Sequence, residues 1–118
     1  MTQRVVITGM GTLNPLGHTV IETWENITRG VSGVGPIKLF DPKGLLVKIA
    51  CEVKNFDPLQ FIEKKDVKKM DIFIQFAIAA SQFAMDDSAL QVTAQNAPRV
   101  GVFIASGIGG FTSIEREH

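Results

Sequence analysis

Hydrophobic residues group into continuous runs in two parts of the chain and alternate with polar ones in a third. Two short runs rich in β-branched residues, 4–8 and 99–105, each lead into a glycine-rich segment. Such continuous runs are typical of strands buried on both faces of a parallel sheet. Over residues 46–54 apolar and charged side chains alternate instead, which predicts a half-buried strand at the edge of a sheet.

Spacings of three and four residues predict helices between these runs. Thr19 is suited to cap a helix that Gly30 ends, and this helix would carry Val20, Trp24 and Ile27 on one face. Because the segments on either side of it, 12–17 and 33–36, are rich in glycine and proline, both are expected to be loops.

The longest helical pattern covers residues 66–85, and a further helix is expected to begin near Phe111. The apolar face of the long helix consists of Met70, Phe73, Ile74, Ala77, Ile78 and Ser81. Strands that alternate with helices predict an α/β fold in which a right-handed crossover joins two parallel strands. Since three strands make a small sheet for so much apolar helix, we expect this pattern to be the opening of a larger domain.

Composition limits the function classes. The 118 residues carry 12 Lys plus Arg and 12 Asp plus Glu, so the net charge of zero gives no general attraction to nucleic acid or to a membrane surface. No apolar run approaches the roughly 20 residues that cross a bilayer, and the N-terminal run is too short for a signal peptide. A single cysteine excludes an internal disulfide and favours a reducing cytoplasm.

Glycine pairs follow both continuous runs, at residues 9–11 and 107–109. They suggest dinucleotide binding, but Asn14 and Thr112 stand where that fingerprint requires its third glycine. The chain also has no Gly-Lys-Ser/Thr triplet, so a P-loop is excluded. Both glycine clusters are therefore interpreted as points where the backbone turns sharply and packs closely.

No residue pattern indicates an active site. Cys51 falls on the apolar side of the alternating segment, so it is expected to be a small buried hydrophobe and not an activated nucleophile. His18 and His118 have no Cys, Asp or His at metal-ligand spacing. We therefore expect no catalytic residue, no metal site and no cofactor in this chain.

Four lysines gather at the start of the long predicted helix, where they would span an arc of about 140°. They are Lys64, Lys65, Lys68 and Lys69, here called the lysine patch. One interpretation is a solvated helix start, in which Glu63, Asp66 and Asp71 offer compensating ion pairs. The other is a docking surface for an acidic partner.

Segments along the whole chain carry a resemblance to one family. They are residues 4–11 (RVVITGMG), 14–17 (NPLG), 23–25 (TWE), 30–37 (GVSGVGPI), 40–41 (FD), 52–57 (EVKNFD), 68–71 (KKMD), 76–77 (FA) and 99–110 (RVGVFIASGIGG). Each segment is a weak signal alone, but the ordered set resembles the β-ketoacyl-acyl-carrier-protein synthases, the condensing enzymes of type II fatty-acid synthesis. Cys51 departs from the family pattern, in which a small residue such as glycine is usual, and this supports its packing role.

The resemblance implies a thiolase-like fold with αβαβα layers, usually a homodimer, of which residues 1–118 form only the first part of the N-terminal half. It implies the decarboxylative condensation of a malonyl carrier protein with an acyl thioester on an enzyme cysteine, which extends the chain by two carbons. The family's cysteine and histidines would lie beyond residue 118. This chain by itself is therefore expected to be inactive.

Two site assignments also follow from the resemblance. Ile108 corresponds to the gate of the acyl pocket, and Lys65, Lys68 and Lys69 correspond to the surface that docks the acidic acyl carrier protein. The remainder of the synthase chain would be the other partner, in a cytoplasmic protein. Two alternatives stay open, a non-catalytic chain-length partner of an active synthase and a stand-alone module that binds a carrier protein.

Overall fold

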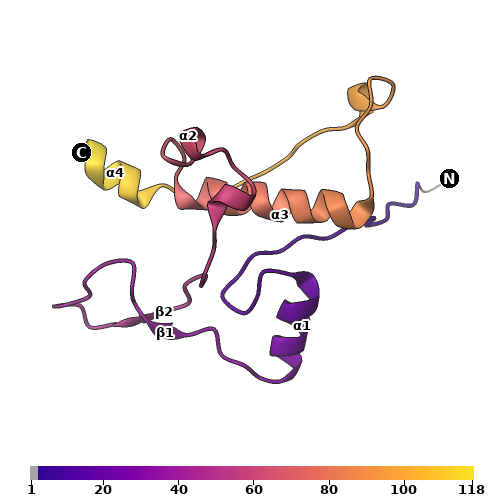
Figure 1. The fold of residues 1–118 in the computed structure, drawn as a ribbon. Helices are drawn as coiled ribbons and strands as arrows, with labels where there is room; N and C mark the ends of the chain where they lie inside the picture. The colour runs from indigo at the N-terminus through magenta and orange to yellow at the C-terminus, as the bar shows by residue number, and fades with distance from the viewer. Residues whose placement is uncertain (1–2) are drawn as a thin grey trace. The chain divides into compact units, whose positions relative to one another are not determined.

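The computed structural model describes residues 3–118, which form two compact units (Figure 1). Thr12–Phe56 form one of them, here called the loop unit, and the described residues up to Gly11 together with Asp57–His118 form the other, called the helical unit. The loop unit contains α1 (Val20–Thr28), β1 (Gly35–Pro36) and β2 (Ile49–Ala50). The helical unit contains η1 (Pro58–Gln60), α2 (Lys64–Val67), α3 (Ile72–Ser88), η2 (Ala97–Arg99) and α4 (Phe111–Glu117).

Helix α1 has the ends that the sequence predicts. The Thr19 hydroxyl accepts a hydrogen bond from the backbone N–H of Glu22 at 3.1 Å, which satisfies one of the free donors at the helix start. Gly30 follows the last turn with φ +67°, the left-handed conformation in which glycine commonly ends a helix. The predicted apolar face is not buried, because Trp24 and Ile27 both remain exposed.

The predicted strand over residues 46–54 is regular only at β2. It pairs antiparallel with β1, so the segment 33–36, expected to be a loop, supplies a strand. The carboxylate of Glu52 accepts the backbone N–H groups of Lys38 and Leu39 at 3.0 and 3.1 Å. Because a side chain takes these donors, the ladder hydrogen bonds do not continue past this point.

The predicted strands at 4–8 and 99–105 are not formed, and the parallel crossover between them is absent from the described residues. In this part of the chain, neither segment has a neighbour with which to exchange ladder hydrogen bonds. Val102 and Phe103 are 84% and 100% exposed. The apolar runs therefore mark segments that would suit burial on both faces, while the paired strand that burial requires is missing here.

The single helix predicted over 66–85 is divided into α2 and α3. The buried side chain of Gln75, only 7% exposed, stabilises the break. Its amide nitrogen donates to the backbone carbonyls of Val67 at 3.2 Å and Met70 at 2.9 Å. These bonds satisfy carbonyl groups at the end of α2 and in the turn after it, which a continuous helix would have satisfied itself.

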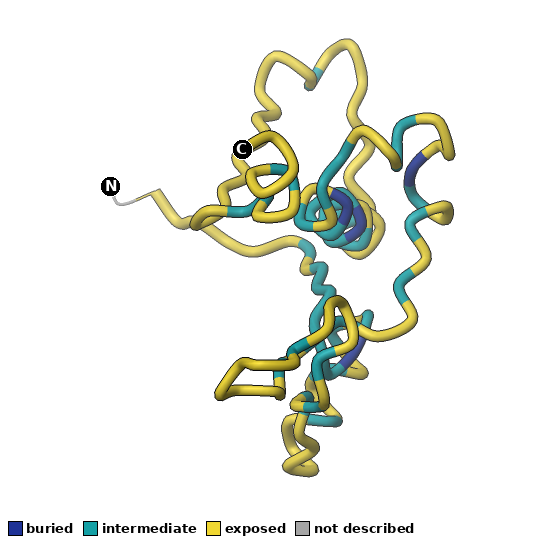
Figure 2. Tube along the Cα trace, turned by 90° about the vertical axis from the view of Figure 1, so that its left-hand side faces the viewer, coloured by how far each residue is buried: buried dark blue, intermediate teal, exposed yellow. Residues whose placement is uncertain are grey.

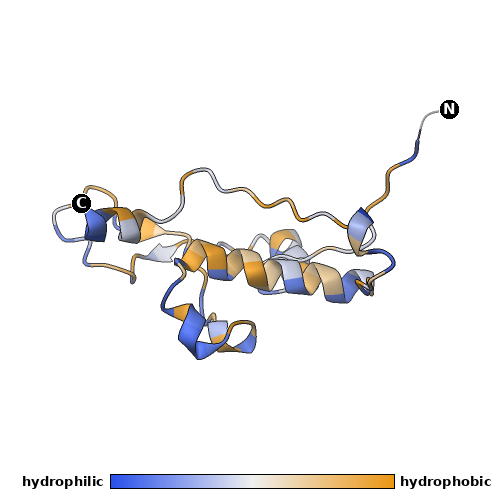
Figure 3. Ribbon diagram, turned by 90° about the horizontal axis from the view of Figure 1, so that it is seen from above, coloured by the Kyte–Doolittle hydropathy of each residue, from blue (hydrophilic) through white to orange (hydrophobic). Residues whose placement is uncertain are grey.

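The small core of the helical unit lies on α3, which is hydrophobic on most of its turns (Figures 2 and 3). Ala79 is fully buried, and Ile62 is the other buried hydrophobic residue in the described chain. Phe61 packs edge to face against Phe83, with ring centroids 5.2 Å apart. Phe61, which precedes α2, therefore covers one side of α3.

Both glycine clusters pack closely, as predicted, but against α3 and not at the ends of formed strands. A Cβ atom at Gly9 would lie 2.5 Å from the backbone oxygen of Ala84, and one at Gly11 would collide with that of Ala80. Gly109 has φ +67°, and a Cβ there would lie 2.8 Å from the ring of Phe73. The first cluster thus permits close approach to a helix, while the second supplies a left-handed turn beside a ring before α4 begins.

Candidate functional site

The lysine patch begins on α2 and continues into the turn that follows it. Lys64 and Lys65 belong to α2, Lys68 is its C-terminal cap, and Lys69 lies in the turn before α3. The predicted arc on one continuous helix is therefore wrong, because α2 ends at Val67. All four side chains are exposed, so the patch remains a charged surface of the helical unit.

Two of the four lysines are already paired. The Lys65 ammonium lies 2.7 Å from the Glu63 carboxylate, and the Lys69 ammonium lies 2.7 Å from that of Asp66. Within the described residues, Lys64 and Lys68 have no ion pair. The compensating pairs expected of a solvated helix start are thus confirmed for Glu63 and Asp66.

Asp71, the third acidic residue considered there, has a different partner. Its carboxylate accepts a hydrogen bond from the Ser113 hydroxyl at 2.7 Å. This bond joins the start of α3 to the first turn of α4. Asp71 therefore connects two elements of the helical unit and neutralises no lysine of the patch.

A small apolar groove of about 200 Å³ runs along α3. It is lined by Phe73, Ile74, Ala77, Ile78, Ile104, Ala105 and Ser106. The first four belong to the predicted apolar face of the long helix, so this face meets the second continuous run of the sequence. Ile108 does not line this groove and is 71% exposed. The predicted gate thus follows the groove-lining segment by two residues.

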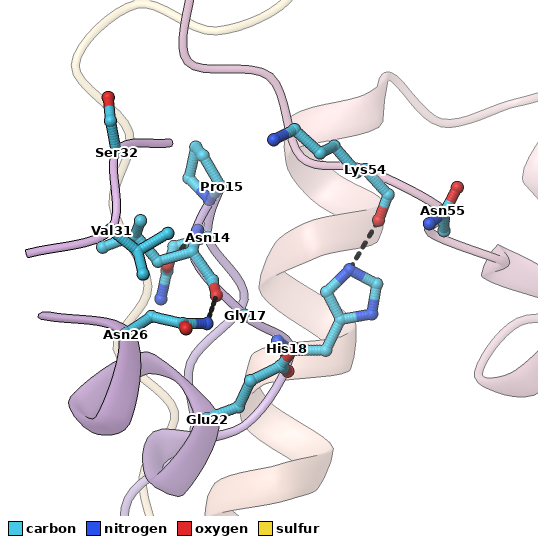
Figure 4. A pocket seen from close by; sticks show the side chains of 11 residues that line it. Asn14, Pro15, Gly17, His18, Glu22, Asn26, Val31, Ser32, Lys54 and Asn55 are labelled. Carbon is cyan, nitrogen blue, oxygen red and sulfur yellow. Dashed lines mark hydrogen bonds between the residues drawn. The ribbon is translucent and has the colours of Figure 1, made fainter. Parts of the chain in front are cut away.

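The loop unit contains a larger polar pocket of about 440 Å³ (Figure 4). One ring nitrogen of His18, Nε2, donates to the backbone carbonyl of Lys54 at 2.7 Å, and the backbone N–H of His18 donates to the Glu22 carboxylate at 2.8 Å. The Asn26 amide donates to the carbonyl of Leu16 at 2.6 Å. These bonds join α1 and the loop before it to the segment after β2.

Asn14 organises the loop that forms one wall of this pocket. Its amide nitrogen donates to the hydroxyls of Thr12 at 2.9 Å and Thr23 at 2.8 Å, and its side-chain oxygen accepts the backbone N–H of Leu16 at 2.9 Å. The sequence predicted a loop over residues 12–17 and no metal-ligand role for His18, and it assigned no hydrogen bonds to either. No short-range signal indicates bonds such as the one from His18 to Lys54, which spans 36 residues.

Three further sequence-based expectations concern Cys51, metal binding and membrane-spanning helices. Cys51 is exposed, so its predicted burial is wrong, because the regular strand ends one residue earlier, at Ala50. Among the residues that the structure describes, no three His, Cys, Asp or Glu side chains are grouped to hold a metal ion. No helix in this part of the chain is long and apolar enough to span a membrane.

Comparison with known proteins relates the chain to one family. Residues 2–118 match the family model described as "Beta-ketoacyl synthase, N-terminal domain". The 3-oxoacyl-[acyl-carrier-protein] synthase 2 proteins of Vibrio harveyi and Coxiella burnetii are 49% and 46% identical to it over 116 residues. The alignments cover 98% of this chain and 28% of each relative. The chain thus spans just over a quarter of the length of the curated relatives it matches.

A solved structure shares the fold. The protein described as "The ishigamide ketosynthase/chain length factor" superposes with a TM-score of 0.72 at 36% sequence identity, over 77% of this chain and 23% of that one. The family model and this neighbour confirm the α/β thiolase-like fold class, although few strands are formed in the described residues. The chain belongs to the beta-ketoacyl synthase family and matches its N-terminal domain.

Proposed function

We propose that the protein containing this chain is a 3-oxoacyl-[acyl-carrier-protein] synthase of fatty-acid synthesis. The observation that carries the proposal is the match of 98% of the chain to relatives of that name, at up to 49% identity. In the proposed reaction a cysteine sulfur holds the acyl group as a thioester. Malonyl carrier protein loses CO₂, and the resulting carbanion attacks the thioester carbonyl. A carbon–carbon bond forms as the carbon–sulfur bond breaks and the cysteine leaves as a thiolate.

In this proposal residues 1–118 are the first part of the N-terminal half, and they supply scaffold and recognition instead of the reacting groups. Val5, Val102 and Phe103 are exposed side chains of the kind that a larger sheet would bury. The rest of the synthase chain would cover them, in a homodimeric protein of the cytoplasm. No cofactor takes part in the proposed reaction.

The lysine patch is the proposed docking surface for the acyl carrier protein, with Lys65, Lys68 and Lys69 in contact. Support comes from the exposure of these side chains and from their grouping within one short turn-and-helix segment. An acidic partner would be attracted over about a Debye length, roughly 8–10 Å at moderate salt. Such attraction mainly raises the rate of association.

Ile108 is the proposed gate of the acyl pocket. It follows the segment that lines the apolar groove and precedes Gly109, whose backbone is left-handed. Its exposed, branched side chain has room to change rotamer. A gate of this kind would admit a long acyl chain only after it swings aside.

A second candidate is a non-catalytic partner that pairs with an active synthase. The observation that favours it is the description of the structural neighbour, which names a chain length factor beside a ketosynthase. Such a partner would have no cysteine at the nucleophile position. It would still use the fold and the surfaces described above.

The deciding experiment uses the product of the complete reading frame that contains these residues. Purified protein is mixed with an acyl carrier-protein thioester and ¹⁴C-labelled malonyl carrier protein, and labelled 3-oxoacyl product is measured. We expect product, and we expect the same activity from Cys51→Ser, since Cys51 is no nucleophile in this account. Absence of product, together with stimulation of a separate active synthase, would replace the first candidate by the second.

A further inference from the structure

The four lysines of the lysine patch are not equivalent. Lys65 and Lys69 are each bound to a carboxylate at 2.7 Å, whereas Lys64 and Lys68 have no such partner among the described residues. Between residues 63 and 71 four lysines face three carboxylates, so the segment carries a net charge of only +1. An acidic partner therefore meets lysines whose positive charge is already partly neutralised by carboxylates of the same segment.

The two internal pairs differ in how firmly they are held. Lys65 and Glu63 are both widely exposed, with 69% and 73% of their side-chain surfaces accessible. Asp66 is only 31% exposed, and it also lies three residues before its partner Lys69. Because solvent screens a pair less when one member is partly buried, the pair between Asp66 and Lys69 is the stronger of the two.

We propose that Glu63 and Asp66 tune docking by holding Lys65 and Lys69 in intramolecular pairs. In this arrangement Lys64 and Lys68 make the first contacts with an acidic protein surface. Lys65 and Lys69 then leave the carboxylates of Glu63 and Asp66 and pair with carboxylates of the partner. The exchange lowers the net gain from each paired lysine, so the complex is weaker and releases quickly. This inference rests on the proposed docking of a carrier protein.

The test is carried out on the complete gene product with an acyl carrier-protein thioester as the substrate. Glu63→Gln and Asp66→Asn each remove one carboxylate and change the side-chain volume little. We expect KM for this substrate to fall by about two- to fivefold at low salt, the range that a released exposed pair can supply. Asp66→Asn should have the larger effect. Both effects should shrink as added salt shortens the Debye length.

Two control variants distinguish the effect on KM of releasing a paired lysine from the effect of changing the net charge. Glu25→Gln breaks an exposed pair with Arg29 in the loop unit and changes the charge equally, so KM should stay as in the parent protein. Asp71→Asn removes a carboxylate close to the patch but frees no lysine. Its effect on KM should be clearly smaller than that of Asp66→Asn.

A double-mutant cycle tests the pair directly. Lys69→Gln should raise KM more in the Asp66→Asn background than in the parent protein, because only there is Lys69 free from the start. Unchanged KM in Glu63→Gln and Asp66→Asn, or an equal fall in Asp71→Asn, would overturn the inference. These results leave the proposed function standing, whereas a gene product that forms no 3-oxoacyl product with any thioester would overturn the function itself.

Discussion

The loop unit and the helical unit are held together by different interactions. In the loop unit, polar side chains such as Asn14, His18 and Glu52 bind backbone groups of segments that have little regular structure. In the helical unit, α3 is covered by apolar residues and by the close approach of Gly9 and Gly11. The first unit depends on hydrogen bonds that satisfy irregular backbone. The second depends on packing.

This difference affects which charged and polar side chains of each unit remain accessible to a partner. The polar groups around the pocket of the loop unit are mostly used by bonds within the unit, as for Asn14 and Asn26. Within the described residues, the helical unit instead leaves two lysines of the patch without an ion pair and an apolar groove open along α3. Recognition in this chain is therefore expected from the helical unit.

The largest effect is expected where packing is closest. Gly11→Ala would place a methyl group against the backbone oxygen of Ala80, which cannot move without shifting α3. We expect a loss of about 2–3 kcal/mol in the free energy of unfolding, measured by urea denaturation of the complete gene product. Gly35→Ala is the control, because nothing lies within 4 Å of its added Cβ. Equal stability of the two variants would show that packing on α3 is looser than described.

A smaller effect is expected in the loop unit. Asn14→Ala removes three side-chain hydrogen bonds and should cost about 2 kcal/mol, with faster amide hydrogen exchange across residues 12–18. Asn26→Ala removes a single bond to Leu16 and serves as a graded control with about half the loss. If amide hydrogens across residues 12–18 exchanged at the same rate in the two variants, Asn14 would not organise this loop.

The smallest stability change concerns the break before α3. Gln75→Met keeps a long side chain but leaves the carbonyls of Val67 and Met70 without their donor, at a cost of about 1–2 kcal/mol. Gln82→Met makes the same exchange at an exposed position of α3 and should change stability by less than about 0.5 kcal/mol. A Gln75→Met protein as stable as Gln82→Met would mean that the amide does not hold the break.

The structural features that the sequence predicted correctly are those that depend on residues close to one another in the chain. The cap of α1 at Thr19, the left-handed glycine at Gly30 and the start of α4 at Phe111 all depend on neighbouring residues, and all three are confirmed. The apolar face of the long helix was also identified, and part of it lines the groove. The family was recognised from ordered short segments and is confirmed by the comparisons.

Features that depend on distant residues were not predicted. The division of α2 from α3 depends on a buried glutamine that bonds backward to carbonyls five and eight residues away. The early end of the short sheet depends on Glu52, which binds N–H groups 13 and 14 residues earlier. Periodicity could not indicate either bond, and it could not supply a paired strand for the runs at 4–8 and 99–105. The roles of Ile108 and the three docking lysines stay predictions.

The most direct test of recognition by the helical unit is a comparison of two substrates in one variant. Lys68→Glu/Lys69→Glu reverses two charges of the lysine patch in the complete gene product. We expect KM for a carrier-bound acyl thioester to rise by about tenfold at low salt, with a weaker dependence on salt, since exposed lysines act through summed and screened attraction. A small thioester without the carrier should be used as before. Equal loss with both substrates, or no loss with either, would contradict the account.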